Sequence, residues 1–163
     1  MLIAGPVILL GDDVSTDVIY PGRYLTVADR AEQALHALEG MGAGWPERLR
    51  AFPIVAAGWN FGCGSSREQA ATALLGAGVK LVVAKSFSRL YMRNCINNGL
   101  PVIENAAIVG HLATGATMSA DVGLGRAQID GAEFEFAPLP SSLLAIIQQG
   151  GLLVQLQAQG QHP

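Results

Sequence analysis

The sequence predicts a mixed α/β fold within a single domain. Apolar runs rich in valine and alanine alternate with helix-forming segments through the middle of the chain, which favours parallel strands joined by helical crossovers. After residue 114 the chain changes to short alternating runs separated by glycines, which indicates antiparallel strands. A chain of 163 residues, half of them hydrophobic, can build one core. We therefore expect one domain over 1–163, with more strands than helices.

The N-terminal part reads as a strand, a turn-rich stretch and a helix. Residues 7–10 form an apolar run that ends at turn residues, so we expect a strand there. Residues 31–38 are expected to form a helix with Asp29 as its N-cap. We expect residues 40–50 to be irregular, because Pro46 should break a helix.

The middle of the chain carries the parallel pattern, and the C-terminal part the antiparallel one. In the middle, we expect strands at 54–57, 79–84 and 102–103, with helices at 66–75 and from Ser86 or Ser88 to 97. Beyond it, we expect strands at 117–121 and 126–136, a hairpin turn at Asp130-Gly131, a helix at 143–149 capped by Ser141-Ser142, and frayed residues at 158–163.

One stretch concentrates the functional signal: Gly58-Trp59-Asn60-Phe61-Gly62-Cys63-Gly64-Ser65-Ser66-Arg67-Glu68-Gln69. It joins a predicted buried strand to a predicted helix, a junction at which backbone N–H groups and the helix dipole attract an anion. The simpler interpretation is a capped helix behind a tight turn, with Ser65 or Ser66 as the N-cap and Glu68 near the capping-box position.

Nucleotide-binding loops do not explain this stretch. A Walker loop needs a lysine before its final serine or threonine, and no lysine is present. A dinucleotide fingerprint needs a third glycine where Arg67 stands. The guanidinium of Arg67 instead offers a planar fork of donors that suits a carboxylate. Together with the two serines it predicts a small acidic substrate.

The net charge and the number of cysteines exclude several classes of protein. A net charge of −3 argues against a nucleic-acid partner. Two cysteines, Cys63 and Cys95, are too few for a disulfide framework or for the thiolates of an iron–sulfur cluster. No histidine has a metal-ligand partner at useful spacing, so we expect no metal on this chain. We find neither a signal peptide nor a membrane span, and we expect a cytoplasmic protein.

The stretch from Asn60 to Ala70 resembles the signature of the aconitase-superfamily swivel domain. Residues 11–25 resemble the opening motif of that family, and residues 85–100 resemble its third motif. More narrowly, the chain resembles the small subunits of 3-isopropylmalate dehydratase and homoaconitase. The resemblance implies a three-layer β/β/α swivelling domain with mixed sheets.

The resemblance also implies an activity and a partner. Relatives of this kind are hydro-lyases that dehydrate and rehydrate di- or tricarboxylates at a [4Fe–4S] cluster, which is expected on a separate large subunit. Ser65 would be the catalytic base and Arg67 would grip a substrate carboxylate. The substrate-binding residues implied are Ser66, Gly64, Asp17, Thr26 and Val27, with Asp17 pairing with a histidine of the large subunit.

Specificity is expected in the loop that contains Thr26 and Val27. Homoaconitase-like relatives carry an arginine at the place of Thr26, which suits an extra carboxylate. Thr26 and Val27 are uncharged, which favours a substrate with an alkyl group, such as the isopropyl group of 3-isopropylmalate. That substrate would place the enzyme in leucine biosynthesis. Gln69 also appears on the homoaconitase side, so a homoaconitase or a dimethylmalate-type dehydratase stays an alternative. A stand-alone carboxylate-binding module is a third hypothesis.

The remaining polar residues have simpler interpretations. Arg89 and Arg93, with Lys85 four residues earlier, are expected on a solvated or subunit-contacting helix face. Leu90 and Tyr91 are expected in the core. Asn94, Asn97 and Asn98 are expected to cap the end of that helix.

Overall fold

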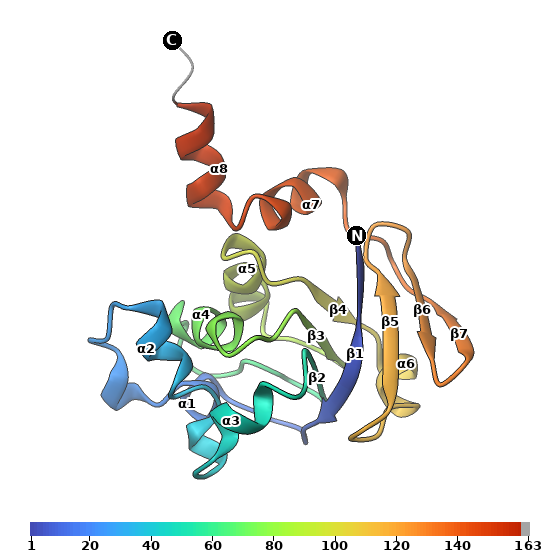
Figure 1. Cartoon of the computed structure of the whole chain (residues 1–163), viewed down its shortest axis with the longest axis horizontal. Helices are drawn as coiled ribbons and strands as arrows, with labels where there is room; N and C mark the ends of the chain where they lie inside the picture. The colour runs from blue at the N-terminus through green and yellow to red at the C-terminus, as the bar shows by residue number, and fades with distance from the viewer. Residues whose placement is uncertain (161–163) are drawn as a thin grey trace.

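A computed structural model describes residues 1–160 of the chain (Figure 1). One seven-stranded mixed sheet has the order β4-β3-β2-β1-β5-β6-β7. The strands are β1 (Leu2–Leu9), β2 (Ile54–Ala57), β3 (Leu81–Ala84), β4 (Val102–Glu104), β5 (Thr117–Asp121), β6 (Arg126–Ile129) and β7 (Ala132–Glu135). The helices are α1 (Thr16–Ile19), α2 (Arg30–Ala34), α3 (Trp45–Leu49), α4 (Gln69–Gly76), α5 (Arg89–Asn97), α6 (Ala106–Gly110), α7 (Ser141–Gln148) and α8 (Leu152–Gln159), with 3₁₀ turns η1 (Gly22–Tyr24) and η2 (Glu39–Met41).

The parallel half of the sheet confirms the predicted alternation of strands and helices. β1 pairs with β2, β2 with β3 and β3 with β4, all in parallel. Every residue of β2 and β3 is buried, as the uninterrupted apolar runs predict for strands covered on both faces. α4 and α5 are the crossover helices between these strands.

The first strand, β1, also belongs to the antiparallel half of the sheet. β1 starts at Leu2, five residues earlier than predicted, because its early residues pair with β5, as in Gly5↔Met118. β5, β6 and β7 then form an antiparallel ribbon. The predicted hairpin turn is confirmed: Asp130 and Gly131 have φ of 47° and 92°, the left-handed conformation that such turns need.

Two hydrophobic cores separate three layers. The first core lies between the parallel strands and α1, α4 and α5, and includes Ile8, Val55 and Tyr91. The second lies on the opposite face of the sheet, where Val7 and Ile54 pack with Met118 of the ribbon. The ribbon therefore curls over the parallel strands, and the predicted β/β/α architecture is confirmed (Figure 1).

Several helix predictions need correction. α2 has its N-cap at Asp29 as predicted, since its Oδ1 accepts from Glu32 N at 2.9 Å, but α2 ends at residue 34. Residues 45–49 form α3, because Pro46 stands in the first turn, where its missing N–H costs no hydrogen bond.

The C-terminal helices also differ from the predictions. α7 starts at Ser141 behind Pro140, without a serine cap. α8 was not predicted, and it extends through residue 159, so the prediction that residues 158 and 159 are frayed is wrong. Residues 161–163 of the predicted frayed stretch lie outside the described residues. Within residues 1–160, no helix is long and apolar enough to cross a membrane.

Candidate functional site

The loop over residues 58–68, here called the glycine loop, connects β2 to α4. Asn60, Gly62 and Gly64 have φ of 61°, 75° and 91°, a left-handed conformation that favours glycine. At Gly62 the space is also closed, because a Cβ would lie 2.2 Å from the ring of Tyr91. The loop path therefore depends on glycine for both backbone and packing reasons.

The opening motif lies against one side of the glycine loop. Gly62 N donates to Val14 O at 2.8 Å, and Thr16 N donates to Cys63 O at 2.9 Å. The buried Thr16 hydroxyl also donates to the carbonyl of Ser65 at 2.8 Å. Two segments almost 50 residues apart in the sequence thus lie side by side, joined by these three hydrogen bonds.

The third motif lies against the other side of the loop. Asn60 N donates to Ser86 Oγ at 2.8 Å, and Ser88 N donates to Phe61 O at 2.9 Å. The side chain of Asn94 donates to Ser66 Oγ at 3.1 Å, so it contacts the loop rather than capping its helix. Asn98 is at the end of the helix, as predicted. The sequence alone does not indicate that Asn94 has a different role from Asn98.

The two serines are not helix caps. α4 begins at Gln69 with Glu68 at the N-cap position, and no side chain caps it. The predictions that Ser65 or Ser66 caps the helix and that Glu68 completes a capping box are therefore wrong. Ser65 and Ser66 are exposed, and the Ser65 hydroxyl has no hydrogen bond within the described chain.

Arg67 is paired with Asp17 across the site. Its Nη1 donates to Asp17 Oδ1, and also to the carbonyl of Tyr20 at 3.4 Å. The Arg67 side chain is 14% exposed, whereas that of Asp17 is 61% exposed, so solvent screens the pair from one side. Gly22 lies beside it, since a Cβ there would be 3.5 Å from both Arg67 Nη2 and Asp17 Oδ1. The sequence does not predict this pairing within the chain.

Thr26 and Val27 lie next to this site but line a separate hollow. The hollow has a volume of about 320 Å³, and its walls come from residues 25–28, from α2 and from the start of α4. Neither Ser65 nor Arg67 lines it. The link is Gln69, whose amide donates to Leu25 O at 3.3 Å. The structure thus brings Asp17, Gly64, Ser65, Ser66 and Arg67 together, with Thr26 and Val27 alongside.

Two predictions about α5 need revision. Leu90 is 53% exposed rather than in the core, whereas Tyr91 is buried as predicted. Arg89 and Arg93 are exposed on α5, but Lys85 precedes the helix, and its Nζ lies 5.8 Å from the centre of the exposed Trp59 ring. Exposed apolar and basic groups therefore flank the glycine loop.

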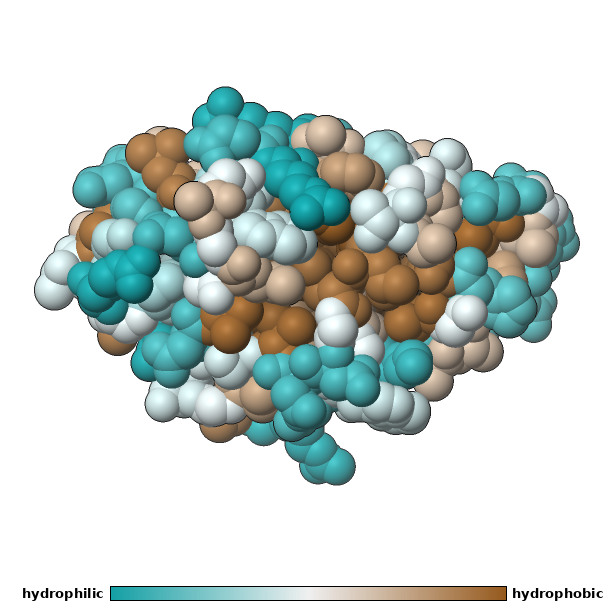
Figure 2. Space-filling model, turned by 90° about the horizontal axis from the view of Figure 1, so that it is seen from below, coloured by the Kyte–Doolittle hydropathy of each residue, from teal (hydrophilic) through white to brown (hydrophobic). Residues whose placement is uncertain are grey.

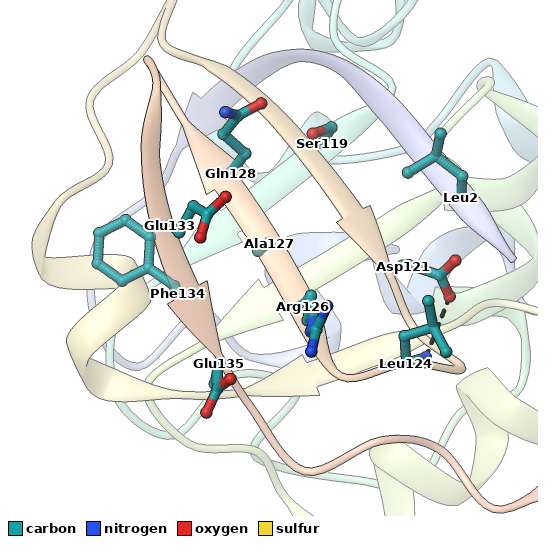
Figure 3. Close-up of a pocket in the computed structure, with 10 residues that line it drawn as sticks. All are labelled: Leu2, Ser119, Asp121, Leu124, Arg126, Ala127, Gln128, Glu133, Phe134 and Glu135. Atoms are coloured by element: carbon teal, nitrogen blue, oxygen red, sulfur yellow. Dashed lines mark hydrogen bonds between the residues drawn. The ribbon is translucent and has the colours of Figure 1, made fainter.

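A larger hollow of about 650 Å³ lies on the antiparallel ribbon, away from the three motifs (Figure 3). Leu124 N donates to Asp121 Oδ1 at 3.1 Å beside it, and Arg126 and Phe134 also line it. Although Ser119, Asp121 and Arg126 line this hollow, no residue of the three motifs does. We therefore place the candidate site at the glycine loop, where the three motifs meet.

The cysteines of this chain do not fit an iron–sulfur cluster. Cys63 is half-buried, and Cys95 is buried beside Tyr91. Burial raises the pKa of the Cys95 thiol to about 12, which disfavours the thiolate that metals bind. Within residues 1–160, no three His, Cys, Asp or Glu side chains gather in a way that could hold a metal ion.

Comparison with known proteins agrees with the motifs. Residues 18–107 match the aconitase C-terminal domain family. The "3-isopropylmalate dehydratase small subunit 1" of Methanopyrus kandleri is 40% identical over 161 residues, covering 98% of this chain and 95% of that protein. The "3-isopropylmalate dehydratase small subunit" of Syntrophus aciditrophicus is 39% identical, covering 96% of both chains.

A solved structure extends this agreement to the fold. The crystal structure of 3-isopropylmalate dehydratase from Methanocaldococcus jannaschii superposes with a TM-score of 0.86 at 34% identity, covering 98% of this chain and 96% of that one. Both the sequence and the structure are therefore similar to members of the same family over nearly the whole length of the chain. The chain belongs to the aconitase C-terminal domain family, among the small subunits of 3-isopropylmalate dehydratase.

Proposed function

We propose that this chain is the small subunit of a hydro-lyase that interconverts 2-isopropylmalate and 3-isopropylmalate by dehydration and rehydration, in leucine biosynthesis. The observation that carries the proposal is 40% identity to a 3-isopropylmalate dehydratase small subunit over 98% of the chain. The exposed serines beside the Arg67–Asp17 pair supply a matching site. Because the proposed enzyme is biosynthetic, we propose that this chain acts in the cytoplasm.

The active enzyme needs a large subunit, which carries the [4Fe–4S] cluster. Trp59 in the glycine loop and Leu90 on α5 are 51% and 53% exposed, and these apolar side chains support contact with another protein there. Figure 2 also shows hydrophobic residues across the middle of one face, surrounded by polar ones. The cluster supplies Lewis-acid chemistry at the leaving hydroxyl, and no residue of this chain is assigned to hold it.

Ser65 acts as the base that takes the proton from the carbon next to a substrate carboxylate. Its hydroxyl is exposed and free within the described chain, while its backbone is fixed by Thr16. A serine oxygen is a weak base, so its anionic form needs stabilisation. Two groups provide it. The backbone N–H groups of Ser65 and Ser66 donate to no other described residue and can donate to the anion, and the cation of Arg67 lies nearby.

Arg67 binds a substrate carboxylate while Asp17 orients it. Among residues 1–160, Arg67 donates through Nη1 alone, to Asp17 and to the carbonyl of Tyr20, which leaves Nη2 available beside Gly22. Asp17 thus sets the plane of the guanidinium, which a bidentate contact requires. Ser66, held by Asn94, and Gly64, which has no side chain to obstruct the substrate, complete the binding surface.

The loop with Thr26 and Val27 faces the variable group of the substrate. Neither residue carries a charge, which favours an alkyl group over a further carboxylate. Homoaconitate is the second candidate, because Gln69 lies at the edge of the same hollow. Gln69 is, however, hydrogen-bonded to the backbone of Leu25, and this engagement favours a structural role for its amide.

Reconstitution tests the proposal. The chain is purified with its large subunit under anaerobic conditions, and hydration of the unsaturated acid is measured for isopropylmaleate, dimethylmaleate and homoaconitate. We expect the highest kcat/KM with isopropylmaleate, and no turnover by the isolated chain. A preference for homoaconitate would establish the second candidate, and tight carboxylate binding without any turnover would favour a binding module.

A further inference from the structure

Glu39 joins three donors beside the loop that faces the substrate. Its Oε1 accepts from Tyr24 Oη at 2.8 Å and from Arg23 Nη2, and its Oε2 lies 2.7 Å from His36 Nδ1. Burial alone would raise the pKa of Glu39, but the hydrogen bonds from His36, Tyr24 and Arg23 outweigh it and lower the pKa. The carboxylate therefore stays ionised and keeps all three donors.

Tyr24 is the residue on which this cluster acts. Its ring stacks on His36 with a centroid separation of 3.6 Å and an interplanar angle of 12°. The guanidinium of Arg23 lies 4.7 Å from the centre of the same ring. The hydroxyl of the buried Tyr20 donates to Tyr24 O at 3.0 Å. Tyr24 is therefore fixed at its ring, its hydroxyl and its backbone.

A second polar contact holds the other end of the loop. The amide of Gln33 donates to Val27 O at 2.9 Å, and its oxygen accepts from the hydroxyl of Thr72 on α4. Gln33 and Thr72 are 6% and 4% exposed, so the hydrogen bond between them is shielded from water, and the one to Val27 O is partly shielded. Leu25 and Thr26, between the two fixed ends, are both exposed.

The fixed loop is continuous with the candidate site. Gly22 starts it against the Arg67–Asp17 pair, and Gln69 holds Leu25 O one residue before Thr26. A shift of Tyr24 would therefore move the wall formed by Thr26 and Val27 relative to Arg67. A wall that discriminates between alkyl groups depends on its position within about a methyl group.

We propose that Glu39 is a positioning residue that sets substrate selectivity: it fixes Tyr24, and through Tyr24 the loop over residues 22–27 relative to Arg67. The selectivity part rests on the function proposed above. Removing the Glu39 carboxylate changes how the enzyme ranks alkyl groups, while the reacting groups stay in place. Glu39 itself touches no substrate.

The test compares Glu39→Ala with Glu47→Ala, an exposed glutamate on α3 whose side chain makes no hydrogen bond or ion pair within the described chain. The first readout is hydrogen exchange in the isolated chain. The amides of Leu25 and Val27 donate to Gly22 O and Tyr24 O, and they should exchange about tenfold faster in Glu39→Ala alone. Glu39→Gln, which keeps an acceptor for Tyr24, should restore part of the protection.

The second readout is selectivity in the reconstituted complex. The ratio of kcat/KM for isopropyl-substituted over methyl-substituted malate should fall about tenfold in Glu39→Ala and stay unchanged in Glu47→Ala. A merely structural role would lower both substrates by the same factor, and that result would overturn the proposal. Unchanged exchange at residues 22–27 would also overturn it.

The two readouts separate this inference from the proposed function. If the wild-type complex turns over no alkylmalate, the proposed function fails, and the selectivity assigned to Glu39 fails with it. Hydrogen exchange in the isolated chain still decides whether Glu39 fixes the loop, because that measurement needs neither substrate nor large subunit.

Discussion

Substitution of Gly62 by alanine should destabilise the chain through the glycine loop. Gly62 has φ of 75°, and a left-handed backbone costs an alanine about 1–2 kcal/mol. A Cβ would also lie 2.2 Å from the ring of Tyr91, which is 1% exposed and cannot move into solvent. Forcing extra volume into such packing costs about 1–3 kcal/mol. The sum is a loss of about 2–5 kcal/mol in unfolding free energy.

Gly78→Ala is the matched control, because Gly78 also has a positive φ, 97°, but a Cβ at that position would meet no other atom within 4 Å. It should lose only the backbone contribution of about 1–2 kcal/mol. Urea unfolding of the isolated chain, followed by circular dichroism, measures both variants. For a chain of this size, the Gly62 variant should also unfold about 4–20 °C lower. Equal losses in the two variants would show that the contact between the loop and α5 contributes nothing.

Three further predictions concern groups around the site. Thr26→Arg in the reconstituted enzyme should raise kcat/KM for homoaconitate relative to the isopropyl substrate, and an unchanged ratio would mean that this loop does not face the variable group. Cys63 should be alkylated by iodoacetamide at pH 8 while Cys95, whose pKa is raised to about 12 by burial, stays unmodified in the native chain, as mass spectrometry would show. Because the folded pKa of Glu39 is lowered, its contribution to stability is present above the unfolded pKa and is lost as the pH falls through the folded value. The difference in unfolding free energy between wild type and Glu39→Gln should therefore shrink from pH 7 to pH 3, and a constant difference would contradict the pairing.

Local patterns were sufficient for the parallel half of the fold. β2 and β3 could be predicted because their apolar runs are short and bounded by turn residues. The central place of β1 could not be predicted, since it depends on pairing with β5, more than 100 residues later. α3 was missed because a proline in the first turn of a helix has the same local appearance as a proline that ends one.

The sequence indicates where the candidate site lies, but not the contacts that its residues make. The glycines and serines of the loop indicate a strand-to-helix junction, and the structure places one there. The start of α4 differs because tertiary contacts override the local capping preference: Thr16 binds the Ser65 carbonyl and Asn94 binds the Ser66 hydroxyl. The Arg67–Asp17 pair joins residues 50 positions apart, and the Arg23–Glu39 pair joins residues 16 positions apart. No spacing rule predicts contacts between residues so far apart in the sequence.

The kcat of Ser65→Ala in the reconstituted complex tests whether Ser65 is the base of a hydro-lyase that a large subunit completes. Because Ser65 is exposed and caps no helix, its substitution should leave the unfolding free energy within about 0.5 kcal/mol of wild type. Loss of the base should lower kcat for the isopropyl substrate by about 10²–10⁴-fold, with KM little changed. A kcat close to wild type, in a complex that contains both subunits, would show that Ser65 is not the base.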